Sequence, residues 1–319
     1  MAVSNFRTSS IRTGVKRNTM WDQSAAVAAT RALFSGGHIS ASTNIIDYIT
    51  ISTTGNATDF GDLSVARRYA GSCSSSTRGV TAGGITAAPA NSDVIDYVTI
   101  ATTGNSTNFG YLTTATGVNG CSNATRGIFF GAYVGGNINF IDYVTIATTG
   151  NATDFGDKTV NFVNDSGCAS TTRALRAGGG IGSSNVIDYL TIATTGNATD
   201  FGDQTVARGY LAGFSSPTRG MWAGGGTTPG FTYSNVIDYV TIASTGNAID
   251  FGDLTTATAD PGATSSSVRG VVAGGSTSVS DVNVIEYVTI ATTGNATDFG
   301  DLTSARDTLA GCSDSHGGL

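Results

Sequence analysis

Polar and apolar residues alternate in a short segment that recurs six times along the chain. In the second copy, residues 96–100 read Asp-Tyr-Val-Thr-Ile, with a β-branched side chain at most positions. This alternation predicts a strand with one buried and one half-exposed face. A second strand is predicted through the Asn-Phe-Gly that ends at Gly110. Gly104 and Asn105 lie between the two segments, and because both tolerate positive φ they predict a tight hairpin.

The recurring tripeptide Ile-Asp-Tyr sets the period of the repeat. Its acids are separated by 49, 46, 46, 50 and 48 residues, and the separation from each isoleucine to the following phenylalanine is always 14. The six acids are Asp47, Asp96, Asp142, Asp188, Asp238 and Glu286. A fixed period with one rigid half indicates a repeat architecture.

The other half of the unit predicts two further strands. In the second unit one ends near residues 71–74, and the next runs from Thr77 to the diglycine Gly83-Gly84. Four strands in about 47 residues match one blade of a β-propeller. We therefore expect an all-β chain that forms a six-bladed propeller of four-stranded antiparallel blades.

The first strand type of the unit has one copy too many. Seven residues occupy its marker position: Ala26, Cys73, Cys121, Cys168, Phe214, Thr264 and Cys312. The surplus predicts that the segment from Ala310 to Ser313 returns to complete the first blade, which would remove an open sheet edge. The predicted organisation is an N-terminal arm over residues 1–25 and a propeller over residues 26–319.

Composition agrees with an all-β chain and limits the class of partner. The chain has 44 glycines, 12% charged and 39% hydrophobic residues, and a net charge of −7. A basic stripe for nucleic acid is not expected, nor is a membrane-spanning or export segment, since no apolar run is long enough. The basic residues before the first acid are Arg7, Arg12, Lys16 and Arg17. They form either a solvated tail or an arm for assembly with an acidic partner.

Residues suited to catalysis or metal binding are few. The four cysteines share one repeat position, which predicts separate buried thiols and not disulfides or a zinc site. His38 and His316 stand at opposite ends of the chain, so no catalytic role, no cofactor and no metal site is expected. Asp-Phe-Gly-Asp recurs in five units, where the carboxylates could hold Ca²⁺ or bind their own turn amides. The second explanation is preferred because Asn108 and Tyr111 replace both acids in one unit.

An arginine also occurs six times, at the start of the second predicted strand of each unit. We expect these arginines to form six partly buried ion pairs with the six acids of Ile-Asp-Tyr and its Glu variant. The arginines are Arg31, Arg78, Arg126, Arg173, Arg219 and Arg269.

All length variation lies between that arginine and the next Ile-Asp-Tyr. One face of the ring would therefore carry variable loops, the usual recognition surface of a repeat array. The candidate binding residues there are His38, Tyr133, Asn137, Phe231 and Tyr233. Length drift in unconstrained loops explains the same variation.

The order of these residues resembles the kelch family of propellers. A strand ending in diglycine (Gly83-Gly84) is followed by a tyrosine (Tyr97) and a second aromatic (Phe109), and other units carry an Ala-Arg segment such as Ala66-Arg67. The chain has phenylalanine where kelch units usually carry tryptophan. The full repeat wording also resembles repeats in virion structural proteins of marine and cyanobacterial tailed phages.

The phage resemblance implies a non-catalytic structural protein of the virion, on capsid or tail, made in the host cytoplasm and present in many copies among other virion proteins. The alternative is a module that recognises a host-surface glycan or protein through the variable loops. A galactose-oxidase type of enzyme would require histidine ligands that this sequence does not offer.

Overall fold

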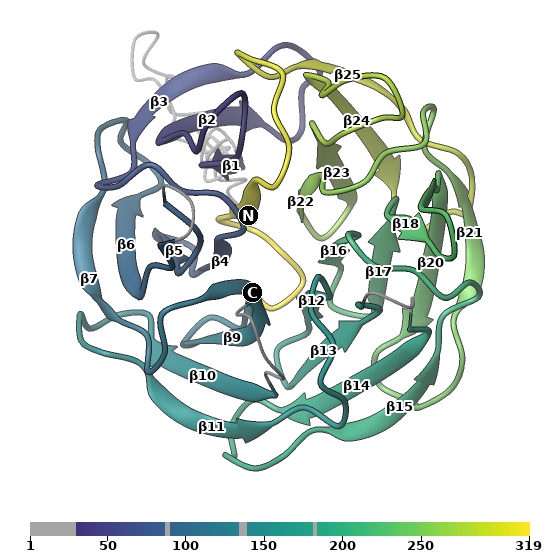
Figure 1. Ribbon diagram of the computed structural model, residues 1–319, viewed down its shortest axis with the longest axis horizontal. Helices are drawn as coiled ribbons and strands as arrows, with labels where there is room; N and C mark the ends of the chain where they lie inside the picture. Colours follow the sequence, from purple (N-terminus) through teal and green to yellow (C-terminus); the bar gives the residue numbers. More distant parts are fainter. Residues whose placement is uncertain (1–29, 87–89, 134–138, 181–183) are drawn as a thin grey trace, which may run out of the picture.

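The computed structural model describes residues 30–86, 90–133, 139–180 and 184–319, and in them six four-stranded antiparallel sheets stand around a central channel (Figure 1). Each sheet is one blade, and its strands run from the channel to the periphery. Blade 1 contains β26 (Ala310–Ser313), β1 (Arg31–Ser35), β2 (Ile45–Thr50) and β3 (Thr58–Asp62). Blade 2 contains β4 (Gly71–Ser74), β5 (Arg78–Ala82), β6 (Val94–Thr99) and β7 (Thr107–Tyr111). Blade 3 contains β8 (Gly117–Ser122), β9 (Arg126–Tyr133), β10 (Phe140–Thr145) and β11 (Thr153–Asp157).

The other three blades repeat this order. Blade 4 contains β12 (Ser166–Ala169), β13 (Arg173–Ala177), β14 (Val186–Thr191) and β15 (Thr199–Asp203). Blade 5 contains β16 (Ala212–Ser215), β17 (Arg219–Ala223), β20 (Val236–Thr241) and β21 (Ile249–Asp253), with the small hairpin of β18 (Gly226–Thr227) and β19 (Thr232–Tyr233) inserted in a loop. Blade 6 contains β22 (Gly262–Ser265), β23 (Arg269–Ala273), β24 (Val284–Thr289) and β25 (Thr297–Asp301). No helix among the described residues is long and apolar enough to cross a membrane.

The ring is closed by the last strand, as predicted. β26 pairs with β1 in the antiparallel register Ala32↔Ser313, Leu33↔Cys312, Phe34↔Gly311 and Ser35↔Ala310. In Figure 1 the yellow C-terminal segment enters the centre of the ring beside the purple first blade. Residues from the two ends of the chain therefore share one sheet.

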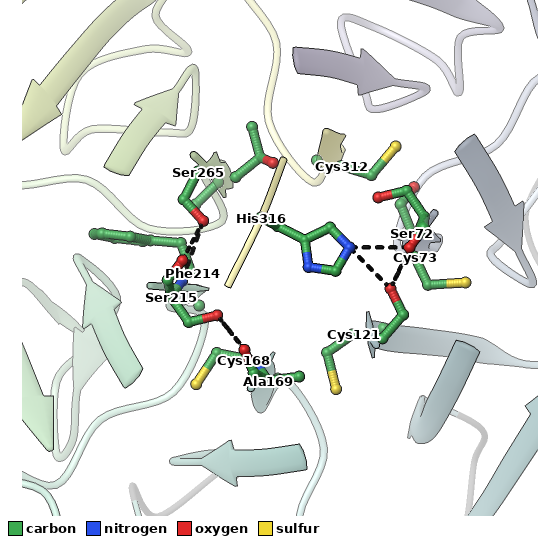
Figure 2. Close-up of a pocket in the computed structure, with 18 residues that line it drawn as sticks. Ser72, Cys73, Cys121, Cys168, Ala169, Phe214, Ser215, Ser265, Cys312 and His316 are labelled. Carbon is green, nitrogen blue, oxygen red and sulfur yellow. Dashed lines mark hydrogen bonds between the residues drawn. The ribbon is translucent and has the colours of Figure 1, made fainter. Parts of the chain in front are cut away.

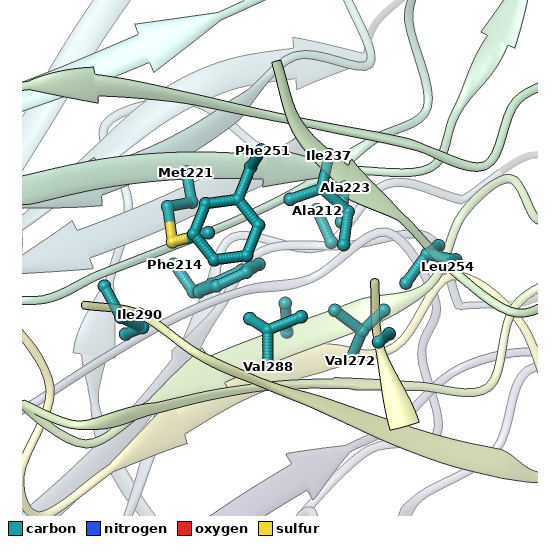
Figure 3. Close-up of a cluster of buried hydrophobic side chains, with 12 residues drawn as sticks. Ala212, Phe214, Met221, Ala223, Ile237, Phe251, Leu254, Val272, Val288 and Ile290 are labelled. Atoms are coloured by element: carbon teal, nitrogen blue, oxygen red, sulfur yellow. The ribbon is translucent and has the colours of Figure 1, made fainter. Parts of the chain in front are cut away.

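The core consists of six hydrophobic clusters, one at each junction between neighbouring blades. At the junction of blades 5 and 6, Phe214 and Phe251 of one blade pack against Val288 and Ile290 of the next (Figure 3). At the junction of blades 6 and 1, Phe299 of the last blade packs against a cluster that contains Phe34. Because every blade is covered on both faces, Ile and Asp at successive positions of β2, β6, β10, β14 and β20 are both buried.

The glycine-asparagine segments do not form the tight hairpin predicted from sequence. The chain reverses earlier, where the Thr102 amide donates to the Thr99 carbonyl, and the segment then runs along the outer strand of the preceding blade. There the Gly104 amide donates to the Phe60 carbonyl, and the Asn105 side chain accepts from the Asp62 amide. Each segment thus occupies polar groups on an edge strand that an isolated blade would leave open.

Antiparallel connectivity gives the ring two different faces. One, the uniform face, carries the six glycine-asparagine segments. The other, the variable-loop face, carries the loops between the second and third strands of each blade: residues 36–44, 83–93, 134–139, 178–185, 224–235 and 274–283, of which 87–89, 134–138 and 181–183 lie outside the described residues.

Candidate functional site

The six recurring acids are buried and face the preceding blade, where each accepts a hydrogen bond from a serine or threonine hydroxyl. For example, Thr113 Oγ1 lies 2.8 Å from Asp142 Oδ1, and Thr303 Oγ1 lies 2.7 Å from Asp47 Oδ1. The remaining donors are Ser64 to Asp96, Thr159 to Asp188, Thr205 to Asp238 and Thr255 to Glu286. The acids are therefore elements of the blade-to-blade contact.

The arginines predicted to pair with these acids are the wrong ones. Arg78 begins β5 opposite Thr99, whereas Asp96 lies opposite Thr81, three residues further along the strand. The ion pair of Asp96 is instead made by Arg67, in the connection that leads into blade 2, at 2.9 Å between Nη2 and Oδ2. The same correction applies to all six predicted pairs: Arg31 with Asp47, Arg78 with Asp96, Arg126 with Asp142, Arg173 with Asp188, Arg219 with Asp238 and Arg269 with Glu286.

Four acids have an arginine partner, and two do not among the described residues. Arg306 pairs with Asp47 at 2.8 Å and Arg208 with Asp238 at 2.9 Å, both from the position of Arg67 in their own repeat. At the same position the third and sixth blades receive Thr116 and Thr258. Accordingly, burial raises the pKa of Asp142 and of Glu286, and the hydroxyl and amide donors only partly offset that rise.

Blade 4 receives its arginine from a different strand. Arg176, on β13, reaches Asp188 at 3.0 Å and also Asp165 at 2.6 Å, and Lys158 lies 3.0 Å from the same Asp165 carboxylate. Although burial opposes ionisation, Lys158 and Arg176 hold the pKa of Asp165 below its usual range. The two acids and two bases form a buried network without net charge, which is how buried charges are tolerated.

The six arginines at the start of the second strands serve a different contact. Arg173 lies over the Tyr189 ring at 4.6 Å from its centroid and donates to the Ile242 carbonyl of the next blade at 2.9 Å. Tyr189 in turn meets Phe201 edge to face, with ring centroids 5.8 Å apart. The same stack of arginine, tyrosine and phenylalanine occurs in every blade.

The central channel is narrow and is blocked near the uniform face by the C-terminal segment. His316 lies at its centre, and its Nε2 donates to the Ser74 carbonyl at 2.9 Å while its Nδ1 accepts from the Gly318 amide at 3.0 Å (Figure 2). Serine hydroxyls of neighbouring blades surround it, each bonded to a carbonyl of the adjacent inner strand. Burial lowers the pKa of His316 to about 4.

The four cysteines are free and buried, and their sulfur atoms point away from His316 into the junctions between blades (Figure 2). Burial raises the pKa of each thiol; that of Cys168 reaches about 12. These thiols pack as small apolar groups in the junction clusters, as the sequence predicted.

The opposite end of the channel opens on the variable-loop face and is strained and polar. A cavity of about 40 Å³ lies there, lined by groups that include Tyr69, Tyr210 and Asp260. Five non-glycine residues around it adopt the left-handed region, with φ between 54° and 60°: Tyr69, Asn164, Tyr210, Asp260 and Thr308. Backbone hydrogen bonds link them from blade to blade, such as Asp260 to Tyr210 and Thr308 to Asp260 at 2.8 Å. Strained residues of this kind are often found at binding sites.

Phe231 and Tyr233, two of the predicted binding residues, lie together beside this opening. Phe231 is 38% exposed and meets Tyr233 edge to face at 5.2 Å between centroids. On its other side it meets Tyr210 at 5.4 Å, so a row of three rings leads from the loop to the channel. Sequence reasoning missed Tyr210, because it belongs to a connection between blades and not to a variable loop.

The other predicted binding residues are not gathered with these rings. His38 lies in the loop of blade 1, beside Asp307. Tyr133 ends β9, and its backbone pairs with Gly117. Asn137 lies outside the described residues, as do Arg7, Arg12, Lys16 and Arg17 of the predicted arm.

No protein-family model and no curated protein matches this sequence. Six four-stranded antiparallel blades around one axis are nevertheless decisive for the architecture. The chain is a six-bladed β-propeller. In this propeller the recurring charged residues hold blades together, and the single-copy residues gather on the variable-loop face.

Proposed function

We propose that this propeller is a non-catalytic structural protein of a tailed-phage virion, held on capsid or tail by contacts with other virion proteins. The observation that carries the proposal is the use of the recurring acids and arginines in contacts between blades. In each repeat, groups that could perform chemistry, such as Asp96 and Arg67, are buried against each other. The resemblance of the repeat wording to phage virion proteins supplies the biological setting, and kelch-like propellers supply the structural parallel.

The architecture suits such a role because the ring is closed and its edges are covered. The uniform face presents nearly the same segment six times, from Gly55-Asn56 in blade 1 to Gly294-Asn295 in blade 6. A rigid disc with one repetitive and one variable face can dock on a neighbour with either side.

Particle analysis tests this proposal. Purified phage particles from the source of the sequence should contain the chain in many copies per particle, quantified by mass spectrometry and localised by antibody labelling in electron micrographs. A matched particle that lacks residues 1–25 should lose the chain while other virion proteins stay. Absence of the chain from purified particles would refute the proposal.

A second candidate, recognition of a host-surface glycan or protein, is favoured by the ring row of Tyr210, Phe231 and Tyr233. Aromatic faces beside polar groups provide stacking and hydrogen bonding for sugar rings. The cavity beside Tyr210 also offers the carboxylate of Asp260 and the amide of Asn164.

Glycan-array binding by the purified chain tests this candidate. Phe231→Ser should abolish any specific binding, because it removes the ring that contacts both tyrosines. Val279→Ser is the matched control, since Val279 is 90% exposed in the loop of another blade. Equal binding by both variants would exclude the ring row as the recognition site.

A further inference from the structure

One group of metal-ligating side chains lies at the junction where blade 6 meets blade 1. His38 comes from the loop of blade 1, Asp281 from the loop of blade 6, and Asp307 from the connection between these blades. A ligand atom from each lies within 4.8 Å of the other two. All three side chains are partly buried, so the group is shielded but can be reached from solvent.

The backbone holds this group in place. The His38 amide donates to the Asp307 carbonyl at 2.9 Å, and the Asp307 amide donates back to the His38 carbonyl at 3.2 Å. Asp281 is held by a bridge to Ser276 within its own loop. The three ligand-bearing positions are therefore ordered before any ligand arrives, which reduces the entropy lost on binding.

The same backbone bridge recurs at other junctions without ligating side chains. The pair equivalent to His38 and Asp307 is Ile85 with Arg68 in blade 2 and Gly226 with Gly209 in blade 5. In blade 6 it is Ser276 with Ala259. Among these described bridges, imidazole and carboxylate stand together where the two ends of the propeller chain meet.

The distances suit shared ligation better than a direct hydrogen bond. His38 Nδ1 lies 3.8 Å from Asp307 Oδ1, which is too far for a hydrogen bond. Two atoms that each bind one zinc ion at about 2.0–2.2 Å are themselves about 3–4 Å apart. One nitrogen and two carboxylate oxygens form a ligand set typical of transition metals, whereas calcium and magnesium prefer oxygen alone.

We propose that His38, Asp281 and Asp307 bind one divalent transition-metal cation of the zinc class, with solvent completing the coordination. The ion links the loop of blade 6 to the loop of blade 1 and fastens the junction that closes the ring. It also offsets the mutual repulsion of the two carboxylates, which, after burial, is the next largest cause that raises the pKa of Asp307. Asp260 adds a further negative charge nearby, while Arg68 opposes the cation.

Calorimetric titration of the full chain with zinc chloride, after removal of metal with EDTA, tests the proposal. We expect one zinc ion per chain with a micromolar or lower Kd, and a higher Tm with zinc that EDTA reverses. His38→Gln and Asp281→Asn should each weaken zinc binding by at least about tenfold, because each removes one of three ligands. Circular dichroism without metal checks that each variant is folded.

Asp93→Asn is the matched control, since Asp93 lies in the corresponding loop of blade 2 and belongs to no such group. It should bind zinc like the unmodified chain. The proposal fails if the unmodified chain does not bind zinc at 100 μM, a concentration about two orders of magnitude above the expected Kd. It also fails if binding survives both ligand substitutions, or if calcium binds equally well and is insensitive to them.

Discussion

Arg306 Nη1 lies 2.8 Å from Asp47 Oδ2, and this fully buried ion pair joins residues 259 positions apart in sequence. Arg306 belongs to the connection that leads from blade 6 into β26, whereas Asp47 lies on β2 of blade 1. The pair therefore crosses the junction at which the ring closes. Equivalent pairs join blade 1 to blade 2 through Arg67 and blade 4 to blade 5 through Arg208.

Arg306→Thr should destabilise the protein by about 3–5 kcal/mol at pH 7, because Asp47 then remains buried without its charge partner. The loss should be smaller at pH 4.5. Without the arginine the pKa of Asp47 rises in the folded state, as for Asp142, and a group with a raised pKa gains stability as the pH falls. Urea unfolding at both pH values measures this, and a cost below about 1 kcal/mol at pH 7 would contradict a structural role for the pair.

Gly202→Ala should cost roughly 1–3 kcal/mol more than Gly246→Ala. Both glycines have φ near +150°, so both alanines carry similar backbone strain. A Cβ on Gly202 would lie 2.5 Å from the Gly246 carbonyl oxygen of the next blade, whereas a Cβ on Gly246 meets no atom within 4 Å. Denaturant unfolding of the two variants isolates this contact, and equal losses would mean that the blades can separate there.

Arg173→Met should cost about 1–2 kcal/mol, since it removes the contact with the Tyr189 face and the hydrogen bond to the Ile242 carbonyl. A double-mutant cycle with Tyr189→Leu should give a coupling energy of about 0.5–1 kcal/mol. Arg173→Lys should recover only part of the loss, because an ammonium group lacks the planar surface that lies on the ring. A coupling energy near zero would show that stacking contributes nothing.

His316 should make the protein less stable as the pH falls below about 6.5. Its pKa is about 4 in the folded chain and 6.5 when unperturbed, so the unfolded state binds the proton first. The contribution of neutral His316 is complete above pH 6.5 and is lost progressively towards pH 4. Carboxyls with raised pKa values, such as Asp142 and Glu286, act in the opposite direction, so the effect of His316 is the difference from a variant. His316→Gln should flatten that difference between pH 7.5 and 4.5 in urea unfolding, and parallel profiles would refute it.

Sequence periodicity predicted the features that every repeat shares. Cys312 has the spacing of Cys73 relative to its Phe-Gly strand, and this alone placed the last strand at Ala310–Ser313. The predicted strand from Thr77 to the diglycine became β5. A constant spacing specifies such positions because each blade must present the same residues to its neighbours.

The contacts between blades were not predictable from that spacing. Both arginine sets lie near the acids in sequence, and only the strand register shows that Arg78 reaches a carbonyl while Arg67 reaches Asp96. The recurrence of Ala-Arg at Arg67, Arg208 and Arg306 was a signal for the true partners, but threonine interrupts it twice.

Single-copy features gave no periodic signal at all. His316 occurs once, and its place in the channel depends on how the chain turns after β26. The grouping of His38 with Asp281 and Asp307 depends on ring closure, which brings loops from the two ends of the chain together.

Closure of the ring by β26 is tested most directly by a disulfide across the pair of Leu33 and Cys312, which lie opposite each other in β1 and β26. Leu33→Cys should form an intramolecular disulfide with Cys312 on mild oxidation, detected by peptide mass spectrometry of the monomer. Val80→Cys is the matched control, because Val80 lies opposite Cys73 in the hairpin of blade 2 and needs no ring closure. The account predicts the cross-link in both variants; a cross-link in the control alone, or one that joins separate chains in the Leu33→Cys variant, would contradict it.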